Sequence, residues 1–280
     1  MQHEKTDTTY LTLDEEPVAP ALGFGTWQLE DDDCTSAIPV AIETGYRHID
    51  TAQIYGNESE VGEGIESSGI DRDELFITTK LWMDNLQPDS VRTTTGRSLD
   101  RLQTDYVDLL LIHWPNDSIP LAETLGAMAE LVDEGKVQHI GVSNFNTDHL
   151  QTAIDVSDKP IFCNQVEYHP YLNQQTLLEF CRQEDIKLVA YSPLARGKVF
   201  QDATLSDIGK NHGKNPGQVA LRWHLQQPGV GAIPKSANPD HIRSNFEIFD
   251  FELSEQEMDR INELQGDGRL IDPDFAPEWD

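Results

Sequence analysis

The stretch GYRHIDTAQIYGNE, residues 45–58, decides the interpretation of the chain. Residues 46–49 follow the turn-forming Gly45 and predict a short buried strand. A glycine-asparagine pair then separates this strand from a helical pattern. Asp50 therefore stands where the strand ends, and Tyr55 lies in the loop beyond it. A carboxylate beside a phenol at this edge suits proton transfer, although on these residues alone Asp50 could equally cap a turn and Tyr55 cover the core.

Seven further apolar, β-rich runs bring the expected strands to eight. With residues 46–49 they are residues 21–24, 75–79, 106–112, 137–142, 161–166, 187–191 and 230–233. Segments with helical spacing separate them, as at residues 121–132 and at residues 90–102 after Pro88. Asn173 is expected to cap one helix, and Ser254 opens a capping box before another.

This alternation predicts an α/β fold with a parallel sheet, most simply a closed (β/α)8 TIM barrel. Residues 8–17 alternate weakly and turn back, which predicts a short N-terminal β-hairpin ahead of the barrel. No Ser/Gly/Pro-rich linker divides the chain, so residues 1–280 are expected to form a single catalytic domain.

Composition limits the class of partner and compartment. The chain has 20 basic and 50 acidic residues and a net charge of −30, which argues against nucleic acid or an anionic membrane. The acids are dispersed, as expected for the acidic surface of a protein from a halophilic source. No apolar run approaches the roughly 18 residues of a membrane span, and no secretory signal is visible. The three cysteines have no metal-ligand spacing and fit a reducing cytoplasm.

Polar titratable groups stand at the carboxyl ends of three neighbouring strands, where barrel enzymes carry their catalytic groups. They are Asp50 with Tyr55, then Lys80, then His113. A tyrosine has an ordinary pKa of about 10, and a nearby Lys80 ammonium is expected to lower it. Asp50 would hold Lys80 charged, and His113 would donate a hydrogen bond to a substrate oxygen. The group would protonate an oxyanion forming on a carbonyl, but no side chain here supplies electrons.

The chain resembles the aldo-keto reductase family over nearly its whole length, and most closely its prokaryotic branch. The matching runs are GFGTW (23–27), residues 45–58, TTKLW (78–82), LLLIHWP (109–115), GVSNF (141–145), NQVEYHPY (164–171), YSPLARG (191–197) and IPKS (233–236). The resemblance implies a nicotinamide-dependent carbonyl reductase that acts as a monomer. Its catalytic tetrad would be Asp50, Tyr55, Lys80 and His113, with Tyr55 as the proton donor.

The same matches imply the residues around the nicotinamide. Ser143 and Asn144 would bind its carboxamide with Gln165 beside them, and Tyr191 would stack on the ring. The chain lacks a G-x-G-x-x-G run, so a Rossmann-type cofactor site is not expected.

The rest of the cofactor would lie along the barrel mouth. Ser192 and Leu194 would meet the pyrophosphate, and Lys235 and Ser236 the adenosine 2′-phosphate of NADPH.

Two departures concern the adenosine end. His241 stands where the family usually has an arginine, and Ser244 where it commonly has a glutamate, while the following Asn245 matches. Arg243 would replace the missing arginine only if its helix were shifted. NADPH is favoured over NADH because Lys235 and Ser236 remain.

The substrate is expected to be a small aldehyde or ketone. Trp27, Trp82 and Trp114 match positions that line the family's pocket, although core packing would also explain them. The branch includes 2,5-diketogluconate, methylglyoxal and general aldehyde reductases, and the short C-terminal tail implies broad specificity.

Three alternatives stay open on the sequence. His48 and Asp50 would point to one side of their strand and could begin a metal site of a barrel hydrolase. Lys80 could form a Schiff base in an aldolase. A cofactor-binding regulatory subunit of the same fold would be expected to lack part of the tetrad, which is complete here.

Overall fold

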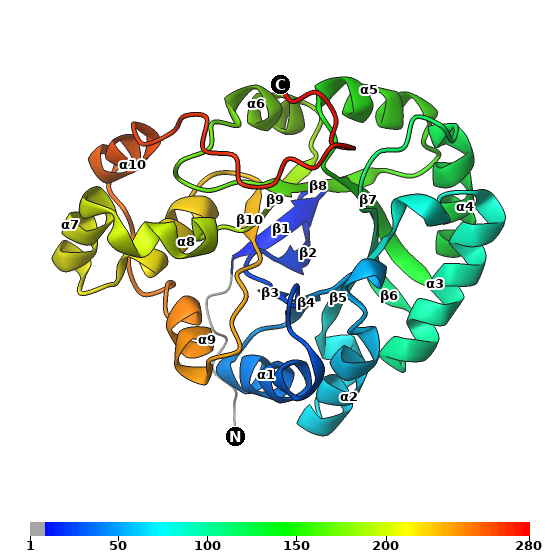
Figure 1. The fold of residues 1–280 in the computed structure, drawn as a ribbon, viewed down its shortest axis with the longest axis horizontal. Helices are drawn as coiled ribbons and strands as arrows, with labels where there is room; N and C mark the ends of the chain where they lie inside the picture. The colour runs from blue at the N-terminus through cyan, green and yellow to red at the C-terminus, as the bar shows by residue number, and fades with distance from the viewer. Residues whose placement is uncertain (1–8) are drawn as a thin grey trace.

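Eight parallel strands form the central sheet of the computed structural model, which describes residues 9–280 (Figure 1). They follow one another around the sheet in chain order, from β3 to β10. Their bounds are β3 (Phe24–Gly25), β4 (His48–Asp50), β5 (Phe76–Leu81), β6 (Val107–Ile112), β7 (Val137–Ser143), β8 (Ile161–Glu167), β9 (Lys187–Tyr191) and β10 (Val230–Ala232). All eight strands expected from the apolar runs are present.

The sheet closes between its first and last strands. Leu22 forms a parallel bridge with Ala232, and the Gly23 N–H donates to the Ala232 carbonyl over 2.9 Å. A Cβ atom on Gly25 would lie 2.8 Å from the Ile233 carbonyl oxygen, so this seam needs glycine for the backbones to approach. The predicted (β/α)8 barrel is confirmed.

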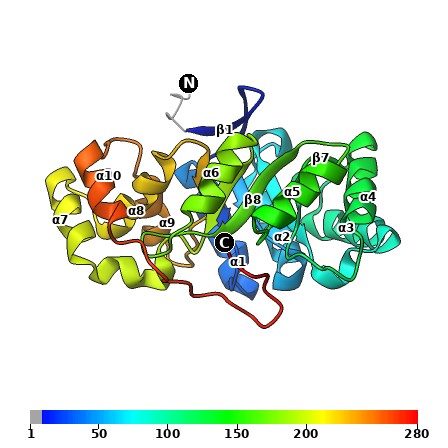
Figure 2. The same ribbon diagram turned by 90° about the horizontal axis from the view of Figure 1, so that it is seen from above.

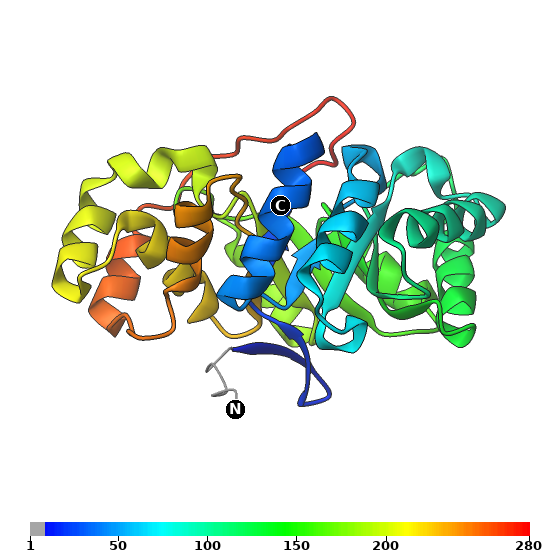
Figure 3. The same ribbon diagram turned by 90° about the horizontal axis from the view of Figure 1, so that it is seen from below.

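The predicted N-terminal hairpin is also confirmed. Strands β1 (Tyr10–Leu13) and β2 (Glu16–Pro20) pair antiparallel, while the first residue of the expected hairpin lies outside the described residues. The hairpin lies at one end of the barrel and the C-terminal tail at the other (Figures 2 and 3). The carboxyl ends of the strands and the C-terminal tail lie at the same, open end of the barrel.

Helices surround the sheet (Figure 1). They are α1 (Asp31–Thr44), α2 (Glu58–Ser68), α3 (Pro88–Leu102), α4 (Leu121–Asp133), α5 (Thr147–Val156), α6 (Gln175–Gln183), α7 (Ala203–His212), α8 (Pro216–Leu225), α9 (Pro239–Phe246) and α10 (Glu255–Asn262), with short 3₁₀ turns η1 (Gln53–Tyr55), η2 (Arg72–Glu74), η3 (Met83–Asn85) and η4 (Ala195–Gln201).

Local signals explain where several helices begin. Pro88 is the first residue of α3, where its missing N–H has no cost. The capping box predicted at Ser254 is present before α10. The prediction for α6 was wrong by one residue: the cap is Gln174, and the Asn173 side chain instead accepts the Gln175 N–H over 3.0 Å. Local hydrogen bonding by asparagine competes with helix capping at such a position.

The buried apolar side chains form one cluster that runs through the sheet and the inner faces of the helices. Strands β5 and β8 are buried along their entire length, as expected for parallel strands covered by helices. All three cysteines are buried and unpaired. Within residues 9–280, no helix is both long and apolar enough to cross a membrane.

Candidate active site

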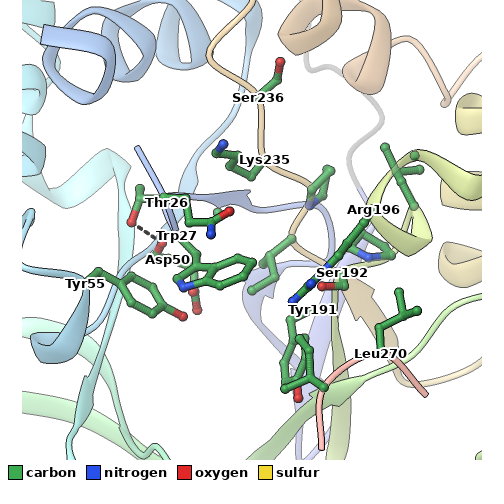
Figure 4. Close-up of a pocket in the computed structure, with 18 of the residues that line it drawn as sticks. Thr26, Trp27, Asp50, Tyr55, Tyr191, Ser192, Arg196, Lys235, Ser236 and Leu270 are labelled. Carbon is green, nitrogen blue, oxygen red and sulfur yellow. Dashed lines mark hydrogen bonds between the residues drawn. The ribbon is translucent and has the colours of Figure 1, made fainter. Parts of the chain in front are cut away.

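A pocket of about 1100 Å³ opens at the carboxyl ends of the strands. Fourteen of the candidate site residues line it: Trp27, Asp50, Tyr55, Trp82, His113, Trp114, Asn144, Tyr191, Ser192, Leu194, Lys235, Ser236, His241 and Asn245. In Figure 4, Trp27 and Tyr55 stand opposite Tyr191 and Arg196, and the loop with Lys235 and Ser236 closes the far side. Residues from most of the chain therefore meet in one cavity.

Asp50 and Lys80 form a buried ion pair at the floor of the pocket, which Asp50 lines and Lys80 does not. The Lys80 Nζ lies 2.5 Å from Asp50 Oδ1 and donates a second hydrogen bond to the Thr51 carbonyl over 2.8 Å. The Gln165 amide donates to the other Asp50 oxygen over 2.6 Å. Burial lowers the pKa of Lys80, and Asp50 offsets part of this by favouring the ammonium. Asp50 is thus in direct contact with the Lys80 ammonium.

Tyr55 lies on the 3₁₀ turn η1 above this pair, and its ring centre is 5.1 Å from the Lys80 Nζ. The expectation that Lys80 lowers its pKa was wrong for the protein without bound ligand. Burial and the nearby Asp50 carboxylate raise the pKa of Tyr55 well above its usual range. The reason is that Asp50 is in direct contact with Lys80, so the pair presents little net positive charge to the phenol.

His113 follows β6 and completes the group around Tyr55. The two rings meet edge to face with centres 5.6 Å apart, and Trp82 packs against the imidazole in the same manner at 5.4 Å. Burial and the Lys80 charge hold the pKa of His113 well below its usual range, so the ring is neutral near pH 7. Its Nδ1 is buried and has no hydrogen-bond partner within residues 9–280.

Ser143, Asn144 and Gln165 form a polar network beside the tetrad. The Ser143 hydroxyl donates to the Gln165 carbonyl over 2.7 Å, and the Asn144 amide donates to the His113 carbonyl over 3.0 Å. Asn144 has a positive φ of 61°, which the asparagine side chain tolerates better than most. Asn144 lines the pocket, whereas Ser143 and Gln165 are buried directly behind it.

Tyr191 ends β9 and faces the cavity. Its hydroxyl donates to Asn144 Oδ1 over 2.8 Å, which leaves the ring standing as one wall of the pocket. The following loop includes Ser192 and Arg196, both with positive φ, so its backbone turns tightly around the cavity. The Arg196 guanidinium lies 5.3 Å from the centre of the Trp27 ring on the opposite side. Arg196 was not among the predicted site residues.

Lys235 and Ser236 lie on the loop that joins β10 to α9. Asn238 caps this helix by accepting the N–H groups of Asp240 and His241. His241 is exposed at the pocket edge, and Asn245 is buried beside it.

The other two family positions at this end differ, because Ser244 lines the pocket together with its partner Asn215 and Arg243 does not. Arg243 does not line the pocket, and its guanidinium lies 3.5 Å from the carboxylate of Asp240 on the same helix. The Ser244 hydroxyl accepts a hydrogen bond from the Asn215 amide over 2.9 Å.

The aromatic wall is larger than the sequence indicated. Phe275, from the C-terminal tail, packs edge to face against Trp82 and Trp114, with ring centres 6.0 and 5.3 Å away. Leu270 and the residues up to Pro273 also line the pocket. The only sequence signal for these residues is the tail's apolar content, which does not indicate where the tail lies.

The structure also bears on two of the alternative sites. Both nitrogens of His48 are engaged, Nδ1 with the Pro20 carbonyl and Nε2 with the Thr78 hydroxyl. No group of three or more potential metal ligands occurs in the described part of the chain. Lys80 is fully buried and outside the pocket lining, which does not suit Schiff-base chemistry.

Comparisons with known proteins agree with this architecture. Residues 21–265 match the Aldo/keto reductase family. Glyoxal reductase of Bacillus subtilis (strain 168) is 44% identical over 253 residues, which span 90% of this chain and 91% of the relative. Methylglyoxal reductase DkgB of Escherichia coli O157:H7 is 40% identical over 265 residues, 93% of this chain and 99% of the relative. A crystal structure described as a candidate 2,5-diketo-D-gluconic acid reductase B superposes with a TM-score of 0.92 at 48% identity and covers 94% of each chain. The protein belongs to the aldo/keto reductase family.

Proposed function

We propose that this protein reduces aldehydes and ketones to alcohols with a nicotinamide cofactor, and that Tyr55 is its proton donor. One observation carries the proposal: Tyr55 and the neutral His113 face one cavity, directly above the buried Asp50–Lys80 pair. Membership of the aldo/keto reductase family supports the same reaction class.

The side chains divide the proton chemistry between them. Bound dihydronicotinamide would supply the hydride. The raised pKa of Tyr55 keeps its phenol protonated near neutral pH, ready for an alkoxide, which is a far stronger base than a phenolate. Neutral His113 donates a hydrogen bond that orients the substrate oxygen beside Tyr55. Although Asp50 offsets most of its charge, the Lys80 ammonium 5.1 Å from the Tyr55 ring centre would favour the phenolate that the transfer leaves behind.

The residues present fit a nicotinamide dinucleotide. The Tyr191 ring forms a flat wall next to the Asn144 side chain, which suits stacking and hydrogen bonding of a nicotinamide with its carboxamide. The buried Ser143 and Gln165 would act there by holding Asn144 and the pocket floor in place.

The polar loop at the far side of the cavity suits the phosphates. Ser192 and Leu194 border the path between the two ends. Lys235 and Ser236 line this part of the pocket and offer a cation and a hydroxyl to a 2′-phosphate. NADPH is therefore the favoured cofactor, and because His241 stands where the family usually has an arginine, NADH would be a weaker one.

The substrate end is apolar. Trp27, Trp82 and Trp114 line it, and Trp27 and Phe275 are each about two-fifths exposed, at 40% and 44%. Relatives named glyoxal and methylglyoxal reductases support small carbonyl compounds as substrates. Broad specificity follows from a wide mouth with few fixed polar groups.

Tyr55→Phe tests the proposal most directly. We expect wild type to oxidise NADPH in molar KCl when offered small aldehydes, and to do so faster than with NADH. The variant is expected to lose about 10³-fold or more in kcat, within the range for removal of a general acid, while the Kd for NADPH stays within about twofold. Retention of most of the activity by Tyr55→Phe would show that another group donates the proton.

Four further expectations stay predictions: one catalytic domain over residues 1–280, a monomeric state, a cytoplasmic location and a halophilic source. Partners are expected to be small carbonyl compounds rather than nucleic acid or membrane.

A further inference from the structure

Glu167, the last residue of β8, has a carboxylate that the proposed reaction does not use. It is fully buried and does not line the pocket. Its Oε1 accepts the Leu270 N–H over 2.8 Å, and its Oε2 accepts the Ile271 N–H over 2.9 Å. A side chain of the barrel sheet thus holds the backbone of the C-terminal tail.

A third donor completes the arrangement. His169 Nδ1 accepts the Tyr171 N–H over 3.3 Å, so the donor of the ring is Nε2, which is 3.0 Å from Glu167 Oε1. Three N–H donors directed at two oxygens suit a carboxylate, which accepts only, and hydrogen bonds to an ionised group are the stronger kind. The Gln174 side-chain amide also donates a hydrogen bond to the backbone carbonyl of Glu167 over 2.8 Å.

The tail that Glu167 holds forms one side of the substrate pocket. From Ile271 onward it contains no helix or strand and crosses the open face of the barrel (Figures 2 and 3). Its far end is fixed separately, because the Asp280 carboxylate accepts both the N–H and the hydroxyl of Thr147. Phe275 lies between the two attachments and packs on Trp82 and Trp114.

We propose that Glu167 is a positioning residue for substrate specificity. By fixing Leu270 and Ile271 it sets the position of the wall that includes Phe275. It therefore controls the KM of carbonyl substrates long enough to touch that wall, and not of the shortest ones. This inference depends on the proposed reductase function for its kinetic part alone.

Glu167→Gln tests it. The glutamine keeps one acceptor oxygen, but its NH₂ group then opposes a tail N–H, so at least one attachment is lost. We expect the KM for benzaldehyde to rise about tenfold, as for the loss of one hydrogen bond to a charged group. The KM for the two-carbon glyoxal, the kcat for both aldehydes and the Kd for NADPH are expected to stay within about twofold. Glu167→Asp, which keeps the charge with a shorter reach, is expected to show the same pattern more weakly, and it replaces the glutamine variant if that one does not fold.

Hydrogen–deuterium exchange gives a readout that needs no turnover. The amides of Leu270 and Ile271 are expected to exchange at least about tenfold faster in Glu167→Gln than in wild type, since their acceptor is lost. Asp108→Asn is the matched control: Asp108 also accepts a backbone N–H, that of Ile77, over 2.8 Å, but at the opposite end of the sheet. It is expected to change neither tail exchange nor the KM ratio of the two aldehydes.

Phe275→Ala tests whether Glu167 acts through the tail. In that background Glu167→Gln should no longer change the KM for benzaldehyde, because the wall it positions is gone. Equal changes for both aldehydes, unchanged exchange at Leu270 and Ile271, or the same effects in Asp108→Asn would each overturn the proposal. If wild type reduces neither aldehyde, the proposed function fails, and exchange alone then decides whether Glu167 holds the tail.

Discussion

Replacing Asp50 by asparagine should destabilise the protein strongly, because it leaves the fully buried Lys80 ammonium without its counter-ion. Breaking a buried pair from one side usually costs about 3–5 kcal/mol. The structure points to the lower end, about 3 kcal/mol, since the Thr51 carbonyl 2.8 Å away still accepts from Lys80. This is a large part of the roughly 5–15 kcal/mol by which domains are stable, yet the variant should still fold.

The loss should also depend on pH. The pKa of Lys80 is lowered by burial in the folded protein, and Asp50 limits that lowering. Without Asp50 the folded-state pKa falls further, while the unfolded value stays near ~10.4. Between the folded and unfolded values the unfolded chain binds more protons, so stability rises with pH. The difference between variant and wild type is therefore greatest below the folded-state pKa of Lys80 in the variant, and it shrinks as the pH rises from there towards the wild-type pKa of Lys80.

Urea unfolding in molar KCl at several pH values measures both effects without changing the ionic strength. The double variant Asp50→Asn/Lys80→Met is the control, because it removes the unpaired charge and should regain stability to within about 1 kcal/mol of wild type. A loss below about 1 kcal/mol in Asp50→Asn, or one that grows with pH, would refute the reasoning that Lys80 is a buried charge dependent on Asp50.

Three further outcomes are expected. The pH profile of kcat/KM for aldehyde reduction should show no loss from His113 protonation between about pH 6 and 8, since the pKa of His113 is lowered. It should also show no loss from Tyr55 ionisation below about pH 10, since the pKa of Tyr55 is raised. A titration midpoint within either range that disappears when His113 or Tyr55 is replaced would contradict this expectation. Burial raises the pKa of the Cys34 and Cys181 thiols to about 12, so iodoacetamide should label them only after unfolding, as mass spectrometry of native and urea-treated protein would reveal. With a net charge of −30, the protein should gain thermal stability as KCl is raised from millimolar to molar concentrations, and a melting temperature independent of salt would show that charge repulsion is already balanced.

The barrel could be predicted from sequence because most of its strands are short, buried and largely apolar. Some of the helices also carry strong local start signals, as at Pro88 and Ser254. The helix start near Asn173 was missed by one residue because the Asn173 side chain accepts the N–H of Gln175, the first helical residue, from one position before the cap.

The candidate active site, like the fold, could be predicted only in part. Asp50, Lys80 and His113 could be found because the barrel brings strand ends together whatever the loops do. The direction of the Tyr55 pKa shift could not, since it depends on how completely Asp50 offsets Lys80 and on how deeply the ring is covered. These quantities are set by distances of a few ångströms between residues far apart in the chain.

The tail was the least predictable part. Residues 270–275 have no periodicity, and their position results from tertiary hydrogen bonds to Glu167 and from aromatic contacts of Phe275. Nothing in a chain segment of this kind indicates its partners in advance.

The seam between Leu22 and Ala232 has a consequence for folding. It joins segments near opposite ends of the chain, so its loop-closure entropy is the largest of any strand pair in the barrel, and it should be the last pair to form and the first to open. The loops that follow its two edges carry Trp27 and Lys235, which both line the pocket. A molecule bound between them would bridge the seam and slow its opening, so ligand occupancy should lengthen the kinetic lifetime of the folded barrel as well as shift its equilibrium stability.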